Sequence, residues 1–164
     1  METAVNEKTR TSGVVPPEVA LGFDGLTLLK GMIAGEYPPP PIAETLGFGL
    51  VEAEPGRAVF EGSPGFRHYN PIGVVHGGFA MTLLDSALGC AVHTTLKAGE
   101  GYTTLEVKVN LVRAITKDTG TVRATGRLIH RGRTTATAEA DLRDAKGNLL
   151  AHGTTTCMIF PAKK

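Results

Sequence analysis

The feature of this sequence that most constrains its fold is the long, nearly uncharged run from His76 to Leu96. Asp85 is the only formal charge in it, and the remaining residues are small, apolar or neutral. A charge is costly in apolar surroundings, and Asp is a poor residue for a helix interior. We expect a helix over residues 76–96 with one carboxylate at the margin of its packed face. That face comprises Met81, Leu84, Leu88, Ala91, Val92 and Thr95.

Two adjacent glycines, Gly77 and Gly78, open this helix. The first helical turn leaves backbone N–H groups unpaired at the positive end of the helix dipole. Because glycine has no Cβ, a ligand can approach these groups closely, and they can hold a developing oxyanion. A purely structural interpretation also fits, with close packing at the glycines and a solvated Asp85. The residues alone leave both interpretations open.

The separation of Gly77 and Asp85 bears on the number of subunits. The two residues are eight positions apart, which is about 12 Å along a helix. One short side chain cannot span that distance. If both residues act on one carbonyl group, Asp85 must come from a second, antiparallel copy of the helix, so a catalytic interpretation requires at least a dimer.

The remaining periodicity indicates one α+β domain, an antiparallel sheet with a single long helix across one face. A covering helix is expected over residues 18–33, followed by the prolines Pro38 to Pro41. Alternating apolar residues and turn signals predict strands over residues 44–54, 57–62, 102–112, 120–130, 133–144 and 149–160, the last four as a meander. Residues 1–17 are expected to form a flexible lead, residues 18–41 a covering helix and proline connector, and residues 161–164 a short tail.

The composition excludes several classes of protein. With 17 basic and 16 acidic residues the net charge is +1, so nucleic acid is not expected as a partner. Cys90 and Cys157 lack the spacing of a metal site, which predicts reduced thiols in a cytoplasmic protein without a metal. No signal peptide is visible at the N-terminus. Asp85, His76 and His93 argue against a membrane span in the apolar run.

A longer motif surrounds the two glycines. N-P-x-G-x-x-H-G-G, from Asn70 to Gly78, is followed by Asp85 within L-L-D-S-A. This combination resembles the PaaI-like acyl-CoA thioesterases of the hotdog-fold superfamily. The similarity extends from about residue 42 to residue 160 and includes T-T-L-E at 103–106 and H-R-G-R at 130–133.

The resemblance implies a hotdog fold, in which an antiparallel sheet wraps around one central helix, and a dimer that often pairs into a tetramer. It implies hydrolysis of an acyl-coenzyme A thioester with no metal or bound cofactor, coenzyme A being part of the substrate. Gly77 would polarise the thioester carbonyl through its N–H group. Asp85 of the other subunit would be the general base, which the short side chain favours, or the nucleophile. Asn70 would orient water or the carbonyl, and Thr104 would hydrogen-bond nearby.

Further residues are expected to bind the substrate. His76 and Gly78 belong to the glycine loop, where the resemblance gives His76 an anchoring role. Arg131, Gly132 and Arg133 form a basic hairpin whose guanidinium groups could reach the phosphates of coenzyme A. A solvated basic hairpin without a ligand is the alternative.

Two rival functions remain open. A hotdog hydratase acting on enoyl thioesters would carry a compact D-x-N-P-x-H pattern, but here His76 follows Asn70 at the wrong spacing, and no acid stands two residues before Asn70. A noncatalytic acyl-CoA-binding protein would have no need of a carboxylate beside an oxyanion site. The acyl group cannot be read from the sequence.

Overall fold

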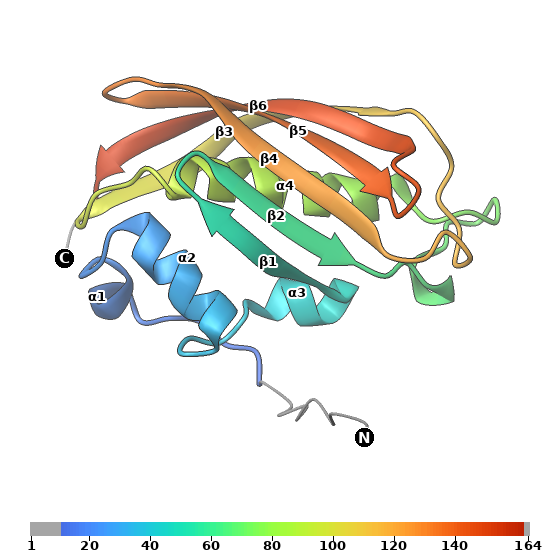
Figure 1. Cartoon of the computed structure of the whole chain (residues 1–164), viewed down its shortest axis with the longest axis horizontal. Helices are drawn as coiled ribbons and strands as arrows, with labels where there is room; N and C mark the ends of the chain where they lie inside the picture. The colour runs from blue at the N-terminus through green and yellow to red at the C-terminus, as the bar shows by residue number, and fades with distance from the viewer. Residues whose placement is uncertain (1–10, 163–164) are drawn as a thin grey trace.

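The computed structural model describes residues 11–162, and six antiparallel strands in it form one sheet that curves around the long helix α4 (Figure 1). The strand order across the sheet is β1-β2-β4-β5-β6-β3. This arrangement confirms the expected hotdog fold. The elements are α1 Pro17–Ala20, α2 Gly25–Ala34, α3 Pro41–Leu46, β1 Phe48–Glu54, β2 Arg57–Gly62, a 3-10 turn Phe66–His68, α4 Gly77–His93, β3 Glu100–Leu111, β4 Val122–Arg131, β5 Thr135–Asp144 and β6 Leu149–Pro161.

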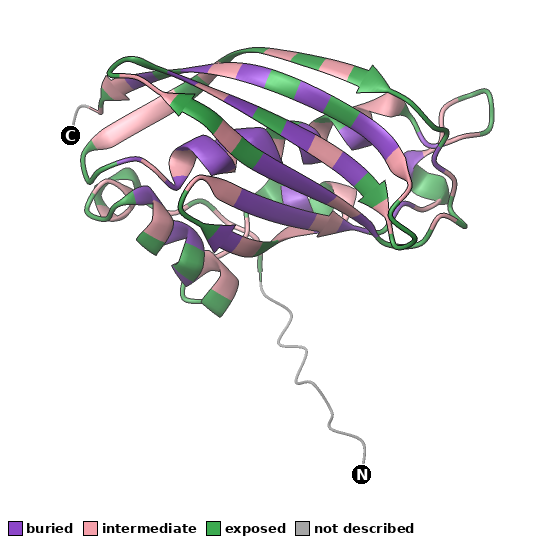
Figure 2. Cartoon of the chain, turned by 45° about the horizontal axis from the view of Figure 1, so that its top comes forward, coloured by how far each residue is buried: buried purple, intermediate pink, exposed green. Residues whose placement is uncertain are grey.

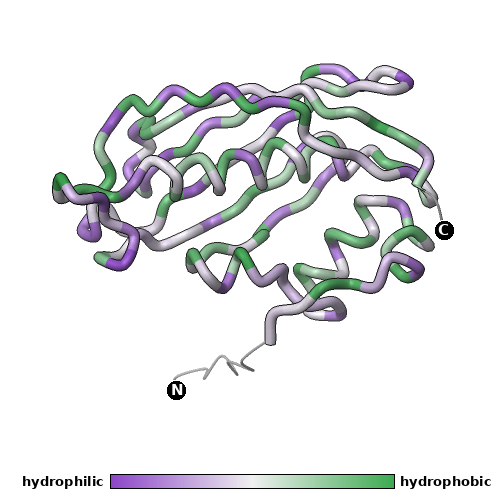
Figure 3. Tube along the Cα trace, turned by 180° about the vertical axis from the view of Figure 1, so that it is seen from behind, coloured by the Kyte–Doolittle hydropathy of each residue, from purple (hydrophilic) through white to green (hydrophobic). Residues whose placement is uncertain are grey.

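The core lies between α4 and the inner face of the sheet. Buried and exposed residues alternate along the strands (Figure 2), as expected for a sheet with one covered face. The largest buried side chains include Leu83, Leu84 and Leu88 of α4 and Leu142 of β5. Seen from behind, α4 lies in front of the sheet (Figure 3), and Asp85 is on its exposed side. The helix thus presents one side to the sheet and another to the surroundings.

The predicted meander of four strands is wrong in one respect. β3 pairs with β6 and not with β4, while β4 pairs with β2. The connection from β3 to β4 therefore returns along the end of the sheet, where the carbonyl oxygen of Ile115 accepts a hydrogen bond from the N–H of Val75 at 2.9 Å. As a result β3 is an edge strand, and the loop before α4 is attached to the loop after β3.

The N-terminal region also differs from the prediction. The helix expected over residues 18–33 is divided into α1 and α2, because Asp24 caps α2 by accepting a hydrogen bond from the N–H of Thr27 at 2.9 Å. The strand expected from residue 44 begins at Phe48. Pro41 starts the helix α3 in its place, and Gly47 ends α3 with a φ of 70°.

The helices α1, α2 and α3 lie below β1 in Figure 1, and α2 and α3 pack against that strand. They thereby protect one edge of the sheet. Of the expected lead, residues 1–10 lie outside the described part of the chain; within the rest, the N–H of Gly13 donates to the carbonyl oxygen of Pro39 at 2.9 Å. Of the expected tail, Pro161 ends β6, and residues 163–164 lie outside the described part.

A β-bulge in β3 changes which of its side chains face α4. Thr104 pairs with Cys157 of β6, and Val107 pairs with Thr155, so the register shifts between Thr104 and Glu106. Cys157 and Thr155 are both buried and lie two residues apart, on the same face of β6. Thr104 and Val107 therefore share the inner face, although strict alternation would place them on opposite faces.

Candidate functional site

The start of α4 is organised by His76, the residue that precedes it. The Nδ1 atom of His76 accepts a hydrogen bond from the N–H of Gly78 at 2.9 Å, and its carbonyl oxygen accepts one from the N–H of Phe79 at 3.0 Å. The anchoring interpretation of His76 agrees with this geometry. Within residues 11–162 the N–H of Gly77 has no hydrogen-bond acceptor. Gly77, and not Gly78, is therefore the donor available to a ligand.

Asn70 shapes the loop that leads to this helix. Its Oδ1 atom accepts hydrogen bonds from the N–H groups of Ile72 at 3.1 Å and Val74 at 3.2 Å. Its own N–H donates to the carbonyl oxygen of Val74 at 2.8 Å. Both side-chain partners are donors, so the oxygen of the amide is the atom that faces the loop. The amide nitrogen has no partner in the described part of the chain and remains available as a donor.

Asn70, His76 and Gly77 line a small pocket of about 220 Å³. Its opposite wall comes from the end of β3 and the following loop, including Leu111 and Arg113. A Cβ atom added to Gly77 would lie 2.6 Å from the Cδ1 atom of Leu111. A larger residue would have to displace the Leu111 side chain, so glycine at this position keeps the N–H group accessible.

Asp85 lies further along α4, beside β3. Its Oδ1 atom accepts a long hydrogen bond of 3.4 Å from the hydroxyl of Thr104, which the bulge in β3 directs toward the helix. Asp85 is exposed, and it lines a second pocket of about 610 Å³ together with Met81, Thr82 and Val107. The structure thus brings Asp85 and Thr104 together within one chain, as a carboxylate with a hydroxyl donor beside it.

The pocket of Gly77 and the pocket of Asp85 have no lining residue in common. Within a single chain the structure therefore separates the candidate oxyanion donor from the candidate base. This separation agrees with the distance of about 12 Å expected along the helix.

The cysteines near Asp85 are not activated as nucleophiles. Burial, and to a lesser degree the negative charge of Asp85, raises the pKa of the Cys90 thiol to about 12. Burial also raises the pKa of Cys157. Both thiols are free and stay protonated at neutral pH, so neither supplies a thiolate. Among residues 11–162, no three His, Cys, Asp or Glu side chains are grouped in a way that could hold a metal ion.

The basic hairpin between β4 and β5 contains two different kinds of arginine. Arg131 forms an ion pair of 2.6 Å with Glu100 and donates to the carbonyl oxygen of Gly132 at 3.3 Å. The backbone N–H of Lys97, and after it Arg131, hold the pKa of Glu100 below its usual range. Arg133 is exposed and has no ion-pair partner in the described part of the chain. The hairpin is closed by a hydrogen bond of 2.8 Å from the N–H of Gly132 to Thr135.

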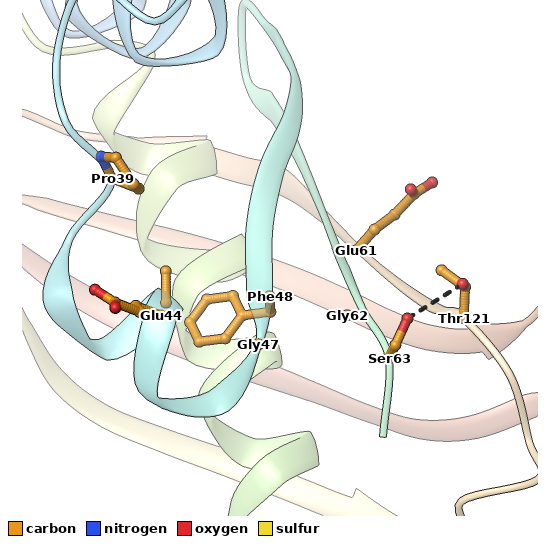
Figure 4. Close-up of a pocket in the computed structure, with 9 residues that line it drawn as sticks. Pro39, Glu44, Gly47, Phe48, Glu61, Gly62, Ser63 and Thr121 are labelled. Carbon is orange, nitrogen blue, oxygen red and sulfur yellow. Dashed lines mark hydrogen bonds between the residues drawn. The ribbon is translucent and has the colours of Figure 1, made fainter. Parts of the chain in front are cut away.

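A third pocket, of about 490 Å³, lies between α3 and the end of β2 (Figure 4). Figure 4 shows the hydroxyls of Ser63 and Thr121 facing each other across 3.4 Å at its rim. Its two carboxylates are already partnered, Glu44 by Ser12 and Glu61 by Arg123. None of its lining residues belongs to the two pockets described above.

Sequence reasoning missed Arg113, which lines the pocket of Gly77. Arg113 follows the predicted strand 102–112 and belongs to no motif, so no local signal distinguished it. Its position depends on the long-range attachment of the loop after β3 to the loop before α4. None of the described helices is long and apolar enough to cross a membrane.

Comparison with known proteins agrees with this architecture. The model of the thioesterase superfamily matches residues 72–151. Human acyl-coenzyme A thioesterase 13 is 31% identical over 63% of this chain and 74% of its own length. The 1,4-dihydroxy-2-naphthoyl-CoA hydrolase of Listeria monocytogenes is 29% identical over 75% of this chain and 97% of its own.

Solved structures show the same relationship. A phenylacetic acid degradation-related protein from Ralstonia eutropha has a TM-score of 0.72 and 30% identity, covering 79% of this chain and 98% of its own. A variant of the phenylacetic acid degradation protein PaaI from Thermus thermophilus has a TM-score of 0.65 and 30% identity, covering 72% of this chain and 97% of its own. The chain therefore belongs to the thioesterase superfamily, as a hotdog-fold protein of the PaaI-like group.

Proposed function

We propose that this protein hydrolyses acyl-coenzyme A thioesters at a site formed by two copies of the chain, with Gly77 from one copy and Asp85 from the other. The observation that carries the proposal concerns Asp85, an exposed carboxylate on the same helix as the unpaired N–H of Gly77. Asp85 accepts a hydrogen bond from the hydroxyl of Thr104 on β3. A base and an oxyanion donor are the two groups that thioester hydrolysis requires.

The surface around Asp85 supports the participation of a second copy. β3 is an edge strand, and large apolar side chains are exposed along it and on the adjacent side of α4. They are Met81 at 44% exposure, Leu105 at 56%, Leu111 at 52% and Val112 at 55%. Exposed apolar side chains beside an open strand edge favour association with another chain. We propose a twofold-symmetric dimer in which β3 of each copy lies against β3 of the other.

The same symmetry would complete the site. A twofold axis beside β3 and perpendicular to it makes the two β3 strands antiparallel, and likewise the two α4 helices. Asp85, in the middle of one helix, would then face the Gly77 end of the other. The Arg131–Arg133 hairpin, which contacts the start of β3 through Glu100, would lie beyond the partner's Gly77 pocket, which is at the end of β3. One axis thus accounts for the whole predicted set of site residues.

In the proposed mechanism the thioester carbonyl oxygen accepts a hydrogen bond from the N–H of Gly77 at the positive end of α4. Asp85 removes a proton from a water molecule, and the oxygen of that water attacks the carbonyl carbon. Gly77 holds the resulting oxyanion, and the amide nitrogen of Asn70 orients the water or the carbonyl. The C–S bond then breaks, and the leaving thiolate takes the proton from Asp85. Thr104 orients the carboxylate throughout.

Coenzyme A as the carrier is supported by the names of the relatives, which include an acyl-coenzyme A thioesterase and a naphthoyl-CoA hydrolase. Within the basic hairpin we propose Arg133 as the phosphate-binding residue, because Arg131 already forms an ion pair with Glu100. Arg131 and Gly132 would then hold the hairpin in position for Arg133.

The test is release of free thiol from a panel of acyl-CoA substrates, aromatic and aliphatic, by the purified protein. We expect hydrolysis of at least one saturated or aromatic acyl-CoA. Binding without turnover on the whole panel would instead identify a noncatalytic acyl-CoA-binding protein. Conversion of enoyl-CoA to hydroxyacyl-CoA with no thiol release would identify a hydratase.

A further inference from the structure

One of the residues that line the pocket of Gly77 is an arginine that has no role in the mechanism above. Arg113 is exposed and lines this pocket together with Gly77 and Asn70. Neither Arg131 nor Arg133 lines the same pocket of its own chain. Arg113 is therefore the arginine that one chain contributes to the pocket of its own oxyanion donor.

The backbone on both sides of Arg113 is held firmly. The N–H of Arg113 donates to the carbonyl oxygen of Leu150 at 3.0 Å, and Ile115 and Lys117 are hydrogen-bonded to the loop before α4. Lys117 donates through its N–H to the hydroxyl of Tyr69 at 3.0 Å. The loop thus fixes the position from which the Arg113 side chain extends, while leaving its end in solvent.

Arg113 has no ion-pair partner within residues 11–162. The charge of Arg113 affects the pKa of one carboxylate, that of Asp144. The pKa of Asp144 is lowered first by the side chain of Asn148 and only weakly by Arg113. Both oxygens of Asp144 already accept hydrogen bonds, from the N–H of Lys146 and from Asn148. The guanidinium of Arg113 therefore retains its donors for another ligand.

Resting on the function proposed above, we propose that Arg113 binds the thiol arm of the substrate by donating to the amide carbonyl oxygen nearest the thioester sulfur. The pocket of about 220 Å³ is smaller than the roughly 300 Å³ at which sites for whole small molecules begin. It can enclose only the thioester end of coenzyme A. The phosphates lie at the far end of the pantetheine arm, too distant for a side chain that shares a pocket with Gly77.

The chemistry of the arm selects the group that Arg113 contacts. Two methylene groups separate the thioester sulfur from the first amide, which is the first polar group along the arm. A guanidinium group only donates hydrogen bonds, so it pairs with the carbonyl oxygen of this amide and not with its N–H. Because Arg113 and Gly77 line the same pocket, the contact would fix the sulfur relative to the oxyanion donor.

The experiment compares one acyl group carried on three thiols: coenzyme A, N-acetylcysteamine, which retains only the first amide, and butanethiol, which has none. Arg113→Met is expected to lower kcat/KM for the first two thioesters by the same factor, about tenfold or more for a charged hydrogen-bond donor. The butanethiol ester should be unaffected. Arg113→Gln, which keeps an N–H donor, should recover part of the loss. Arg127→Met, on the outer face of the sheet beside Asp141, is the matched control and should behave as wild type with all three.

Each other result overturns the proposal. A loss confined to the coenzyme A ester would show a phosphate contact, an equal loss on all three esters would show a structural effect, and no loss would show no contact. Thermal unfolding of Arg113→Met should match wild type, since the side chain is exposed. A wild-type protein that hydrolyses none of the three would refute the proposed function itself, whereas a deviating pattern with an active wild type refutes only the role of Arg113.

Discussion

At the scale of single residues, the proposed chemistry depends on one exposed carboxylate and its neighbour. Asp85 contributes little to packing, because its side chain is exposed, and its hydrogen bond to Thr104 is long. Asp85→Asn keeps the shape of the side chain and removes the base. We expect kcat to fall by about 10² or more with no change in the unfolding temperature. Thiol release and thermal unfolding measured on the same preparation check this, and a variant with wild-type kcat would refute the general-base role.

The two arginines of the basic hairpin are expected to respond differently to mutation. Arg133→Ala should raise KM for acyl-CoA by about tenfold and leave hydrolysis of an acyl-pantetheine unchanged, because only coenzyme A carries the nucleotide phosphates. Arg131→Ala should lower the unfolding temperature, because it breaks the ion pair with Glu100. If the effects were exchanged between the two variants, the phosphate contact would belong to Arg131.

At the scale of elements, α4 lies directly on β4 where the strand has a glycine. A Cβ atom added to Gly126 would lie 2.1 Å from the carbonyl oxygen of Ala87, which is backbone and cannot move aside. Gly126→Ala is therefore expected to destabilise the fold by about 1 to 3 kcal/mol or more. Gly49→Ala is the control, since a Cβ atom there would meet nothing within 4 Å. Equal unfolding free energies for the two variants in urea would contradict this helix–strand contact.

The end of α4 makes stability depend on pH. Burial lowers the pKa of His93, which packs on Tyr102 with ring centroids 5.3 Å apart. In the unfolded chain a histidine titrates near pH 6.5, at about its usual pKa. Below that pH the unfolded chain binds a proton that the folded chain does not, so stability falls as the pH decreases through the lowered pKa.

Urea unfolding between pH 7 and pH 5 measures this effect. The free energy of unfolding should decrease over that range in wild type and less steeply in His93→Gln. His68, whose pKa is lowered by burial and then by Arg67, contributes a further part of the slope. His152→Gln, at an exposed position on β6, is the control for loss of a histidine outside the core. A slope unchanged in His93→Gln would mean that His93 is not kept neutral by the fold.

At the scale of the whole molecule, the proposal requires two copies of the chain, and the expected pairing of dimers into a tetramer would add a second interface. Mixing two inactive variants tests the shared site. In a mixed dimer of Asp85→Asn and Gly77→Val, one site combines the intact Gly77 of the first chain with the intact Asp85 of the second. After full exchange half of the dimers are mixed, so about a quarter of wild-type activity should return.

Verified subunit exchange without recovered activity would exclude a site of this composition. Sedimentation of each parent variant is the control, because both must remain dimers for the mixing to be interpretable. Neither substitution is at a position of the buried core. The atom that a Cβ at Gly77 would meet is the end of the flexible Leu111 side chain, which can move, so both parents are expected to fold.

The sequence by itself determined the features that depend on local interactions. The uncharged run around Asp85 identified α4, and Pro55-Gly56 and residues 144–148 marked hairpins that the structure contains. The hydrogen bonds of the Asn70 and His76 side chains were also predictable, because they join residues two to four positions apart. In such segments residue type and spacing settle the conformation, since the interacting groups are neighbours along the chain.

Only the tertiary structure decided the features that join distant segments. The pairing of β3 with β6 sets the bulge that directs Thr104 to Asp85, whereas strict alternation along the strand would place Thr104 and Val107 on opposite faces. Likewise Arg131 pairs with Glu100, which lies 31 positions earlier in the sequence. The hydrogen bond between Val75 and Ile115 brings Arg113 to the pocket of Gly77. These contacts are set by strand order and register, which are fixed by burying the shared core and not by any local preference of the residues involved.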